Sequence, residues 1–390
     1  MLRREVAISH VAGILAGAGA TVLGPILPVL SRSWSLSDAE GGALLACEFM
    51  GGFCGAIASG WLGARQALTT LLAAGLALLA LGFAGAALMA KPWMPLCLFG
   101  CGLGLGFINP VANLVVSRAN LPSPAAALNL FSFSWAAGAL ATPSVVAVCL
   151  RHEPVAGVFG ELATLAAAAA VLASMGIAGG SRELASAAPR AGEGTHSGTG
   201  WFIAISGALL FLYVGVETSV SVWLPTGAAR WAAVTASAGA ATQSTFWAAL
   251  LMGRLLAPVW LRRVQPRTLI LAGLLSGGAG VGLLLAACGY RSLLVGAVLA
   301  GLGLAPVNPT IVATFTTRLG SAAARWTGLV FASAGLGGAA VPWVVGAMSS
   351  HFTSLRIGFA APLFSIGCMF CLELALGTRP FGLTSQTSSG

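Results

Sequence analysis

Long apolar stretches separated by short polar connections run through almost the whole chain. A helix that crosses a bilayer needs about 20 consecutive, mostly apolar residues, and twelve stretches reach that length. The first ends at residue 30, and the others cover 41–64, 67–90, 93–117, 126–150, 157–180, 200–225, 233–261, 268–289, 292–315, 323–348 and 355–377. The pattern predicts two six-helix bundles, 1–180 and 200–378, joined by a polar linker at 181–199 and followed by a disordered tail at 379–390.

A glycine-rich segment occurs twice, in the fourth stretch of each half. Residues 102–110 read Gly-Leu-Gly-Leu-Gly-Phe-Ile-Asn-Pro, and residues 301–309 read Gly-Leu-Gly-Leu-Ala-Pro-Val-Asn-Pro. The glycines do not match a phosphate-binding loop, which would follow a strand and open a helix. Parallel repeats over half a polytopic chain are instead typical of the major facilitator architecture, an all-α membrane fold of two pseudo-symmetric six-helix bundles.

Composition places the chain among integral membrane proteins. Of its 390 residues 57% are hydrophobic and only 7% are charged, with a mean hydropathy of +0.93. The net charge of +9 does not indicate a nucleic-acid partner, because the basic residues are scattered singly between apolar runs. The eight cysteines lie within or at the ends of these runs, and no nearby histidines or acids complete a set of four ligands, so we expect no metal site and no cofactor.

The short connections show an asymmetry of positive charge. With twelve spans, twelve arginines fall on one side of the membrane and six basic residues on the other. The richer side holds Arg3, Arg4, Arg65, Arg118, Arg182, Arg190, Arg262, Arg263, Arg267, Arg318, Arg325 and Arg379; the poorer side holds Arg32, Lys91, Arg151, Arg230, Arg291 and Arg356. Since positive charge is retained in the cytoplasm, both termini and the linker are expected there, in a multi-pass protein of the inner (plasma) membrane.

Two acids lie well inside predicted spans, whereas Glu161 and Glu373 lie close to predicted boundaries and can reach the headgroups. Glu217 is sixteen residues beyond Trp201, which at ~1.5 Å per residue places it about 24 Å into a hydrocarbon layer of about 30 Å. Such a carboxyl must line a water-filled cavity, pair with a cation or be protonated, so we expect it to bind substrate or a proton. Glu48 lies about two turns inside the outer end of its helix, where a role in proton coupling and simple snorkelling both remain open.

Other polar and aromatic side chains within the spans complete the candidate site. Arg254 would either pair with an acid and take part in gating, or snorkel to the cytoplasmic surface. The amides Asn109, Asn113, Asn129, Gln243 and Asn308 and the indoles of Trp135, Trp223 and Trp247 are candidate substrate contacts. Amides can hold hydroxyl groups and an indole face suits the C–H side of a sugar ring, although helix–helix packing is the competing interpretation for each.

We do not expect an enzyme. The four histidines, His10, His152, His196 and His351, fall at span ends or in connections. They form no Ser-His-Asp or Cys-His arrangement within the spans.

The sequence resembles the fucose–galactose–glucose proton symporter family of the major facilitator superfamily, to about residue 377. Tyr-Val-Gly-Val-Glu-Thr-Ser at 213–219 is similar to that family's helix 7, and Leu-Asn-Leu at 128–130 with Gly138 and Pro143 is similar to its helix 5. Trp247 with Gly253-Arg254 resembles its helix 8. The resemblance implies a twelve-helix sugar transporter.

Two departures from the family bear on mechanism. Fucose-type members have acids in helices 1 and 4, where this chain has Gly24 and Asn109. In the superfamily's motif between helices 2 and 3, Ala64 replaces the usual aspartate, which removes a gating ion pair and leaves Arg65 as the gating candidate.

These observations predict a secondary active transporter that moves a small polar solute, a monosaccharide or similar polyol, by alternating access. We expect the protein to be a monomer embedded in the lipid bilayer. A proton is the candidate coupling ion. An exporter of amphipathic compounds is the first alternative, favoured by the tryptophans. The second is a membrane sensor that binds sugar without moving it, which would be expected to carry a soluble output domain.

Overall fold

The computed structural model describes residues 2–63, 65–119, 124–152, 154–177, 199–320 and 323–378. Every regular element in these ranges is a helix. The predicted tail lies outside the described residues, as does the predicted linker except for its last residue, where a helix begins.

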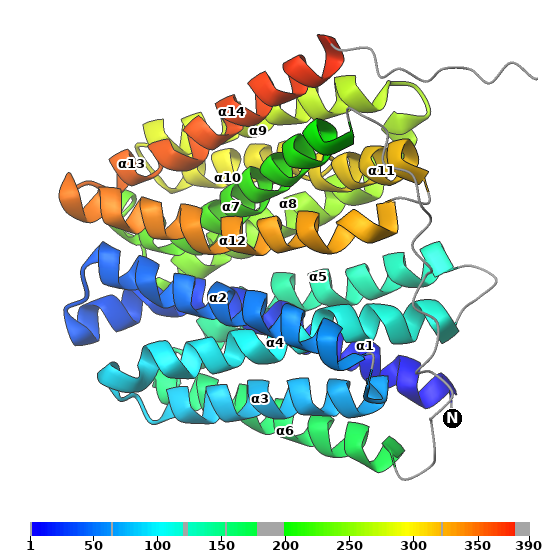
Figure 1. The fold of residues 1–390 in the computed structure, drawn as a ribbon. Coiled ribbons are helices and arrows are strands. Elements are labelled where there is room, and N and C mark those ends of the chain that lie inside the picture. Colours follow the sequence, from blue (N-terminus) through cyan, green and yellow to red (C-terminus); the bar gives the residue numbers. More distant parts are fainter. Residues whose placement is uncertain are drawn as a thin grey trace, which may run out of the picture.

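The two halves of the chain form two stacked sets of helices (Figure 1). The first set consists of α1 (Leu2–Trp34), α2 (Asp38–Gly63), α3 (Leu68–Ala87), η1 (Lys91–Trp93), α4 (Met94–Ala119), α5 (Pro124–Cys149) and α6 (Val155–Ile177). The second consists of α7 (Thr199–Trp231), α8 (Ala236–Leu261), α9 (Pro266–Ala286), α10 (Tyr290–Leu304), α11 (Val307–Leu319), α12 (Ala323–His351), α13 (Leu355–Gly358) and α14 (Ala360–Thr378).

Twelve helical stretches of the described chain are long and apolar enough to cross a membrane. In three of them two elements make one span: η1 with α4, α10 with α11, and α13 with α14. The predicted fold class is confirmed, and the predicted spans agree with the observed helices to within a few residues at most ends. We call the end of the bundle where α1 begins and α14 ends the terminal face, and the opposite end, with the connections at 35–37 and 232–235, the loop face (Figure 1).

The repeated glycines bring equivalent helices into backbone contact in each half. A side chain at Gly102 of α4 would collide with the carbonyl of Glu48 on α2, and one at Gly104 would lie 2.6 Å from a carbonyl of α3. In the second half, a side chain at Gly301 would lie 2.6 Å from the carbonyl of Phe246 on α8, and one at Gly303 would collide with α9. The repeat therefore packs α4 against α2 and α3, and α10 against α8 and α9, because only glycine permits this approach.

The two copies of the repeat differ in their backbone. α4 continues through Asn109 and Pro110, whereas the equivalent span is interrupted at Ala305 and Pro306, between α10 and α11. Pro306 stands where the first copy has Phe107. Proline lacks a backbone N–H and its ring crowds the preceding turn, and Pro306 with Pro309 places two prolines within one turn, whereas α4 has only Pro110. The additional proline therefore accounts for the break.

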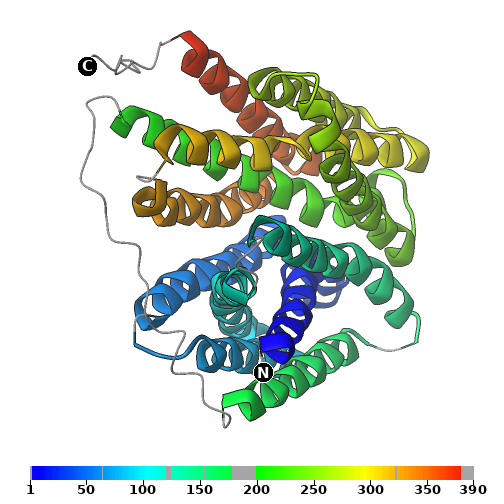
Figure 2. The same ribbon diagram turned by 90° about the vertical axis from the view of Figure 1, so that its right-hand side faces the viewer.

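Contacts between the two halves come from a few helices. α1 packs against α7 and α8, α2 packs against α12, and α5 packs against α8. Figure 2, which looks onto the terminal face, shows the two bundles side by side. A site shared by the halves is therefore expected among α1, α2, α5, α7, α8 and α12. Helices α4 and α10 pack directly behind them, α4 against α1 and α2 and α10 against α8.

Candidate functional site

A hydrogen-bonded group of three side chains lies between α7 and α8. Arg254 Nη2 donates to Glu217 Oε1 at 2.8 Å, and the hydroxyl of Tyr213 donates to the same oxygen at 3.1 Å. Tyr213 and Glu217 are four residues apart and therefore lie on one face of α7. The side chains of Arg254 and Glu217 are 27% and 12% exposed. Of the two roles left open for Arg254, pairing with an acid is the one that the structure shows.

A second polar group, the Gln243 cluster, consists of Gln243, Ser221, Trp247 and the carbonyl of Thr21. Gln243 Nε2 donates to the carbonyl of Thr21 on α1 and to Ser221 Oγ on α7, both at 3.1 Å. Trp247 Nε1 donates to the same hydroxyl at 2.8 Å. Gln243 is fully buried, and among the residues that the structure describes its Oε1 has no hydrogen-bond partner. Because Thr21 belongs to the first half, this cluster joins the halves, one helical turn along α7 from Glu217.

Gly24 of α1 packs directly against the Gln243 cluster. A methyl group at this position would lie 2.6 Å from Gln243 Oε1 and 2.9 Å from Nε2. The space that a side chain on helix 1 would enter is therefore filled by a neutral carboxamide from the other half. A larger side chain, such as a carboxylate, would not fit at this position of α1 beside Gln243.

Helix α5 completes the junction from the first half. The rings of Trp135 and Trp247 meet edge to face, with centroids 5.5 Å apart. One turn before Trp247, the hydroxyls of Ser244 and Ser144 are 2.8 Å apart, and Ser244 Oγ also donates to the carbonyl of Leu140 at 3.2 Å. Two of the predicted tryptophans and the predicted glutamine thus come together where α1, α5, α7 and α8 meet.

The predicted asparagines are more dispersed. Asn109 and Asn113 are half-buried on α4, where Asn113 Nδ2 donates to the carbonyl of Asn109 at 2.8 Å. Asn308 is half-buried at the second position of α11, just after the helix break, and Asn129 is exposed on α5. That Asn109 and Asn308 face each other across a central cavity stays a prediction.

Two predicted residues are buried away from this junction. Trp223 is only 1% exposed, and its Nε1 donates to the carbonyl of Pro342 on α12 at 3.0 Å. Glu48 is 3% exposed on the side of α2 that packs against α4, inside the first bundle.

The predicted gating residue Arg65 lies just beyond α2. Its guanidinium carbon is 4.2 Å from the ring centroid of Trp61, which is 60% exposed. This is a cation–π contact between a residue just beyond α2 and the last turn of the same helix, within the first bundle.

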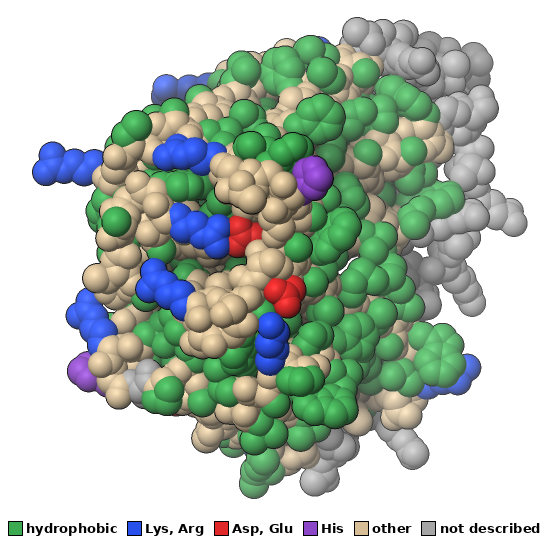
Figure 3. All heavy atoms as spheres, turned by 90° about the vertical axis from the view of Figure 1, so that its left-hand side faces the viewer, with side chains coloured by type: hydrophobic (Ala, Val, Ile, Leu, Met, Phe, Trp, Pro, Cys, Tyr) green, Lys and Arg blue, Asp and Glu red, His purple; other side chains and the backbone are tan. Residues whose placement is uncertain are grey.

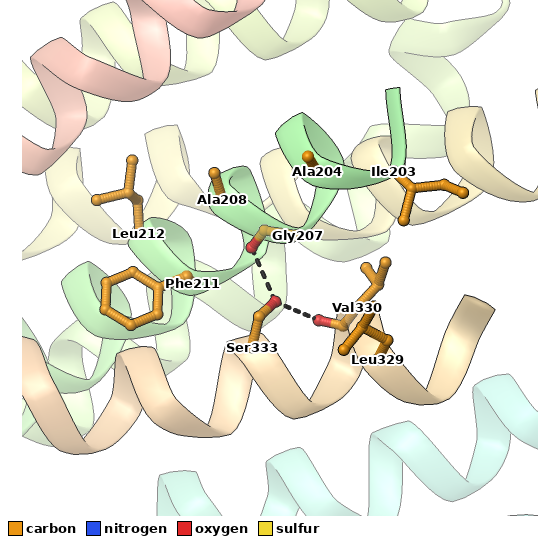
Figure 4. Close-up of a pocket in the computed structure, with 9 residues that line it drawn as sticks. All are labelled: Ile203, Ala204, Gly207, Ala208, Phe211, Leu212, Leu329, Val330 and Ser333. Carbon is orange, nitrogen blue, oxygen red and sulfur yellow. Dashed lines mark hydrogen bonds between the residues drawn. The ribbon is translucent and has the colours of Figure 1, made fainter. Parts of the chain in front are cut away.

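An apolar pocket of about 440 Å³ lies between α7 and α12. Figure 4 shows the two helices on either side of it, with the hydroxyl of Ser333 directed at the carbonyls of Gly207 and Val330, to which it donates at 2.8 and 2.6 Å. The other lining residues are Ile203, Ala204, Ala208, Phe211, Leu212 and Leu329. The pocket contains none of the predicted site residues and offers almost no polar surface.

Four residues of these groups carry no individual signal in the sequence. Tyr213 belongs to the helix 7 motif, and the structure adds that its hydroxyl binds Glu217. Ser221 is one serine in an apolar span. Arg230 counts in the sequence only toward the charge asymmetry, yet it forms an ion pair with Asp38 between the halves.

In the part of the chain that the structure describes, no group of three or more His, Cys, Asp or Glu side chains could hold a metal ion. The groups available at the junction are a carboxylate, a guanidinium, a carboxamide, hydroxyls and indoles. Such a set can bind a polar solute through hydrogen bonds, and it can hold one titratable proton on Glu217.

Comparison with known proteins defines the fold. No family model and no curated protein matches the sequence. Among solved structures, a bacterial homolog of the human lysosomal transporter Spinster, inward-facing and unoccupied, is 15% identical with a TM-score of 0.78, over 98% of this chain and 99% of that one.

Two further structures agree. A nucleoside transporter gives a TM-score of 0.74 at 14% identity, over 97% and 99% of the two chains. The fucose:proton symporter of E. coli gives 0.63 at 18% identity, over 95% and 98%. The chain therefore has the fold of the major facilitator superfamily transporters over nearly its whole length.

Proposed function

We propose that this protein is a secondary active transporter that moves a small, neutral, polyhydroxylated solute, such as a monosaccharide, by alternating access. The observation that carries the proposal is the Gln243 cluster with Trp135, at the junction of the two halves. Its amide and hydroxyl groups can exchange hydrogen bonds with sugar hydroxyls, and its indoles offer apolar faces to the ring. Two proteins of similar structure, a nucleoside transporter and a fucose:proton symporter, support a polyhydroxylated substrate.

The unpaired Oε1 of Gln243 is the acceptor that we assign to a substrate hydroxyl. It is buried, and a buried acceptor without a donor costs about 1–3 kcal/mol. A hydroxyl that reached it when the halves separate would relieve this cost. The half-buried amides Asn109, Asn113 and Asn308 are proposed as further contacts, with Asn129 nearer the entrance.

Proton coupling is proposed to run through Glu217. It is the acid that lies beside the junction, and it is held by one cation and one phenol. Protonation of its carboxylate would weaken the attraction to Arg254, so the proton and the pairing of α7 with α8 are physically linked. Glu48, enclosed between α2 and α4, is proposed only as a secondary proton carrier.

The excess of arginines on one side of the predicted spans supports an orientation of the protein in the membrane. We propose that the terminal face is cytoplasmic and the loop face is external, in the inner membrane of the cell, with the chain acting as a monomer.

Reconstitution tests the function directly. Purified protein in proteoliposomes should take up a radiolabelled monosaccharide faster than empty liposomes, and an imposed pH gradient should drive accumulation above the outside concentration. A panel of hexoses, pentoses, nucleosides and polyols should be used. Absence of transport for the whole panel, with orientation and integrity verified, would contradict the polyol assignment.

The apolar pocket between α7 and α12 favours one alternative, a transporter of amphipathic compounds. Such a substrate would place an apolar group in the pocket, and Ser333, whose hydroxyl is already engaged, would add little. Leu329→Ala enlarges the pocket, so under this alternative it should change the affinity for apolar compounds. Under the main proposal it should leave sugar uptake unchanged.

A further inference from the structure

Asp38 and Arg230 join the two halves at the loop face. Arg230 Nη1 donates to Asp38 Oδ2, and Nη2 donates to Oδ1, both at 2.6 Å. Asp38 is the first residue of α2 and Arg230 lies in the last turn of α7. Figure 3 looks onto this face and shows acidic side chains lying against basic ones near its centre. A bidentate arginine–carboxylate pair is both stronger and more strictly oriented than a single contact.

Two serines of α12 add to this pair. Ser349 Oγ donates to Asp38 Oδ2 at 2.5 Å, and the backbone N–H of Ala39 donates to Ser350 Oγ at 2.8 Å. The backbones are close as well, since a side chain at Gly346 would collide with the carbonyl of Asp38. The start of α2 is therefore attached to α7 and α12 at once. We call Asp38, Arg230, Ser349 and Ser350 the outer clasp.

A neighbouring ion pair shows what is special about the clasp. Glu40, on the same turn of α2, pairs with Lys91 at 3.4 Å, with side chains 50% and 46% exposed. Both residues belong to the first half, so this pair does not join the bundles. Asp38, by contrast, is only 9% exposed although Arg230 is 42% exposed, and its carboxylate accepts hydrogen bonds from Arg230 and Ser349 of the second half.

Packing below the clasp continues the same interface. The ring of Trp223 lies 3.6 Å from the position of a side chain at Gly41, and a side chain at Gly42 would lie 3.1 Å from Trp343. Further along α2, Phe49 packs against Gly338. From the loop face inwards, α2 and α12 are thus in contact without room for a solute between them.

We propose that the outer clasp is a latch that holds the protein closed at the loop face. The inference rests on the proposed transport function, because it assigns the latch to one state of alternating access. To open this face, α2 must separate from α7 and α12, which breaks the ion pair and both serine contacts. Weakening the clasp therefore shifts the population toward the state that is open at the loop face.

The test is cysteine labelling from the side of the loop face. Ala46 lies between Gly42 and Phe49 on the side of α2 that faces α12, and it is half-buried. With the eight native cysteines replaced by serine, Ala46→Cys is the reporter, labelled by a membrane-impermeant maleimide. We expect Asp38→Asn to raise the labelling rate about tenfold, the population shift that ~1.4 kcal/mol produces.

Glu40→Gln is the matched control and should leave the labelling rate unchanged. The double variant Asp38→Arg with Arg230→Asp should return labelling toward the parent rate, because it restores a pair with reversed polarity. If Asp38→Asn does not yield a monodisperse protein, Arg230→Lys decides instead, since it keeps the charge and loses the bidentate contact; a severalfold rise is expected.

Equal rates in the parent, Glu40→Gln and the clasp variants would overturn the proposal. So would equal increases in the clasp variants and in Glu40→Gln, which would indicate general loosening. The readout needs no substrate. A chain that labels as expected but carries no sugar would contradict the proposed substrate and leave the latch supported.

Discussion

Arg254 and Glu217, 37 positions apart in the chain, share a 2.8 Å charge-assisted hydrogen bond between α7 and α8. Each side chain neutralises the other, because an unpaired charge within a membrane-spanning helix is costly. Tyr213 binds the same carboxylate oxygen, so the group is a triad centred on Glu217. Its chemistry suits a proton switch in the second half, beside the junction with the first.

Replacing Glu217 by glutamine should separate coupling from transport. Glu217→Gln keeps the shape and removes titration, so we expect exchange of substrate across the membrane to persist and accumulation driven by a pH gradient to disappear. Both are measured in proteoliposomes. Glu161→Gln, which changes an exposed acid on α6, is the control and should behave as wild type.

A different result would identify a different role. Loss of affinity by ~1–3 kcal/mol with the pH dependence intact would mean that Glu217 only hydrogen-bonds the substrate. Wild-type behaviour in both assays would make the acid structural and remove the best-placed proton carrier.

Breaking the ion pair from the other side should destabilise the protein. Arg254→Gln leaves Glu217 without its cation, and loss of one partner of a buried pair costs about 3–5 kcal/mol. The double variant Glu217→Gln with Arg254→Gln removes both charges and should lose less stability than the single variant Arg254→Gln. Thermal unfolding in detergent measures the stabilities of these variants. Arg65→Gln, at an exposed position, is the control and is expected within ~0.5 kcal/mol of wild type. Additive losses would show that the two side chains are energetically independent.

The close approach of Gly24 to Gln243 predicts a rescue. Gly24→Ala should cost about 1–3 kcal/mol, because its methyl group would lie 2.6 Å from Gln243 Oε1 and the carboxamide can move away only by giving up its bonds to Thr21 and Ser221. Adding Gln243→Ala frees that space and should recover much of the loss in thermal stability. Gly282→Ala on α9, where a methyl group meets nothing within 4 Å, should be neutral or stabilising by up to about 1 kcal/mol. A Gly24→Ala protein as stable as Gly282→Ala would contradict the packing.

Orientation in the membrane can be checked with two single cysteines. Ser186→Cys, in the predicted linker, should react with an impermeant maleimide only from the cytoplasm. Ser33→Cys, exposed near the loop-face end of α1, should react only from outside. The expectation follows from the excess of arginine on one side. The reverse pattern would overturn the assignment of the terminal face to the cytoplasm.

Much of the fold could be predicted because the bilayer imposes a local rule. Each span must satisfy its backbone within one helix and present about 20 mostly apolar residues, so length and hydropathy alone reveal it. The repeated glycines at 102–110 and 301–309 then indicated two related halves. The difference between α4 and the broken α10–α11 span also has a sequence signal, because the second copy adds Pro306 to the shared Asn-Pro pair.

The sequence by itself determined the twelve spans, the two halves and the presence of an acid, an arginine and several amides deep within them. Only the tertiary structure decided which of these meet. Helix packing between distant segments turned Arg254 toward Glu217, set Gln243 against Gly24, enclosed Glu48 between α2 and α4, and brought Asp38 to Arg230. The physical reason is that the bilayer stabilises each apolar helix separately, so a span depends only on its own residues. Whether two side chains meet depends on the crossing angle and rotation of two helices, and these depend on all the contacts between them.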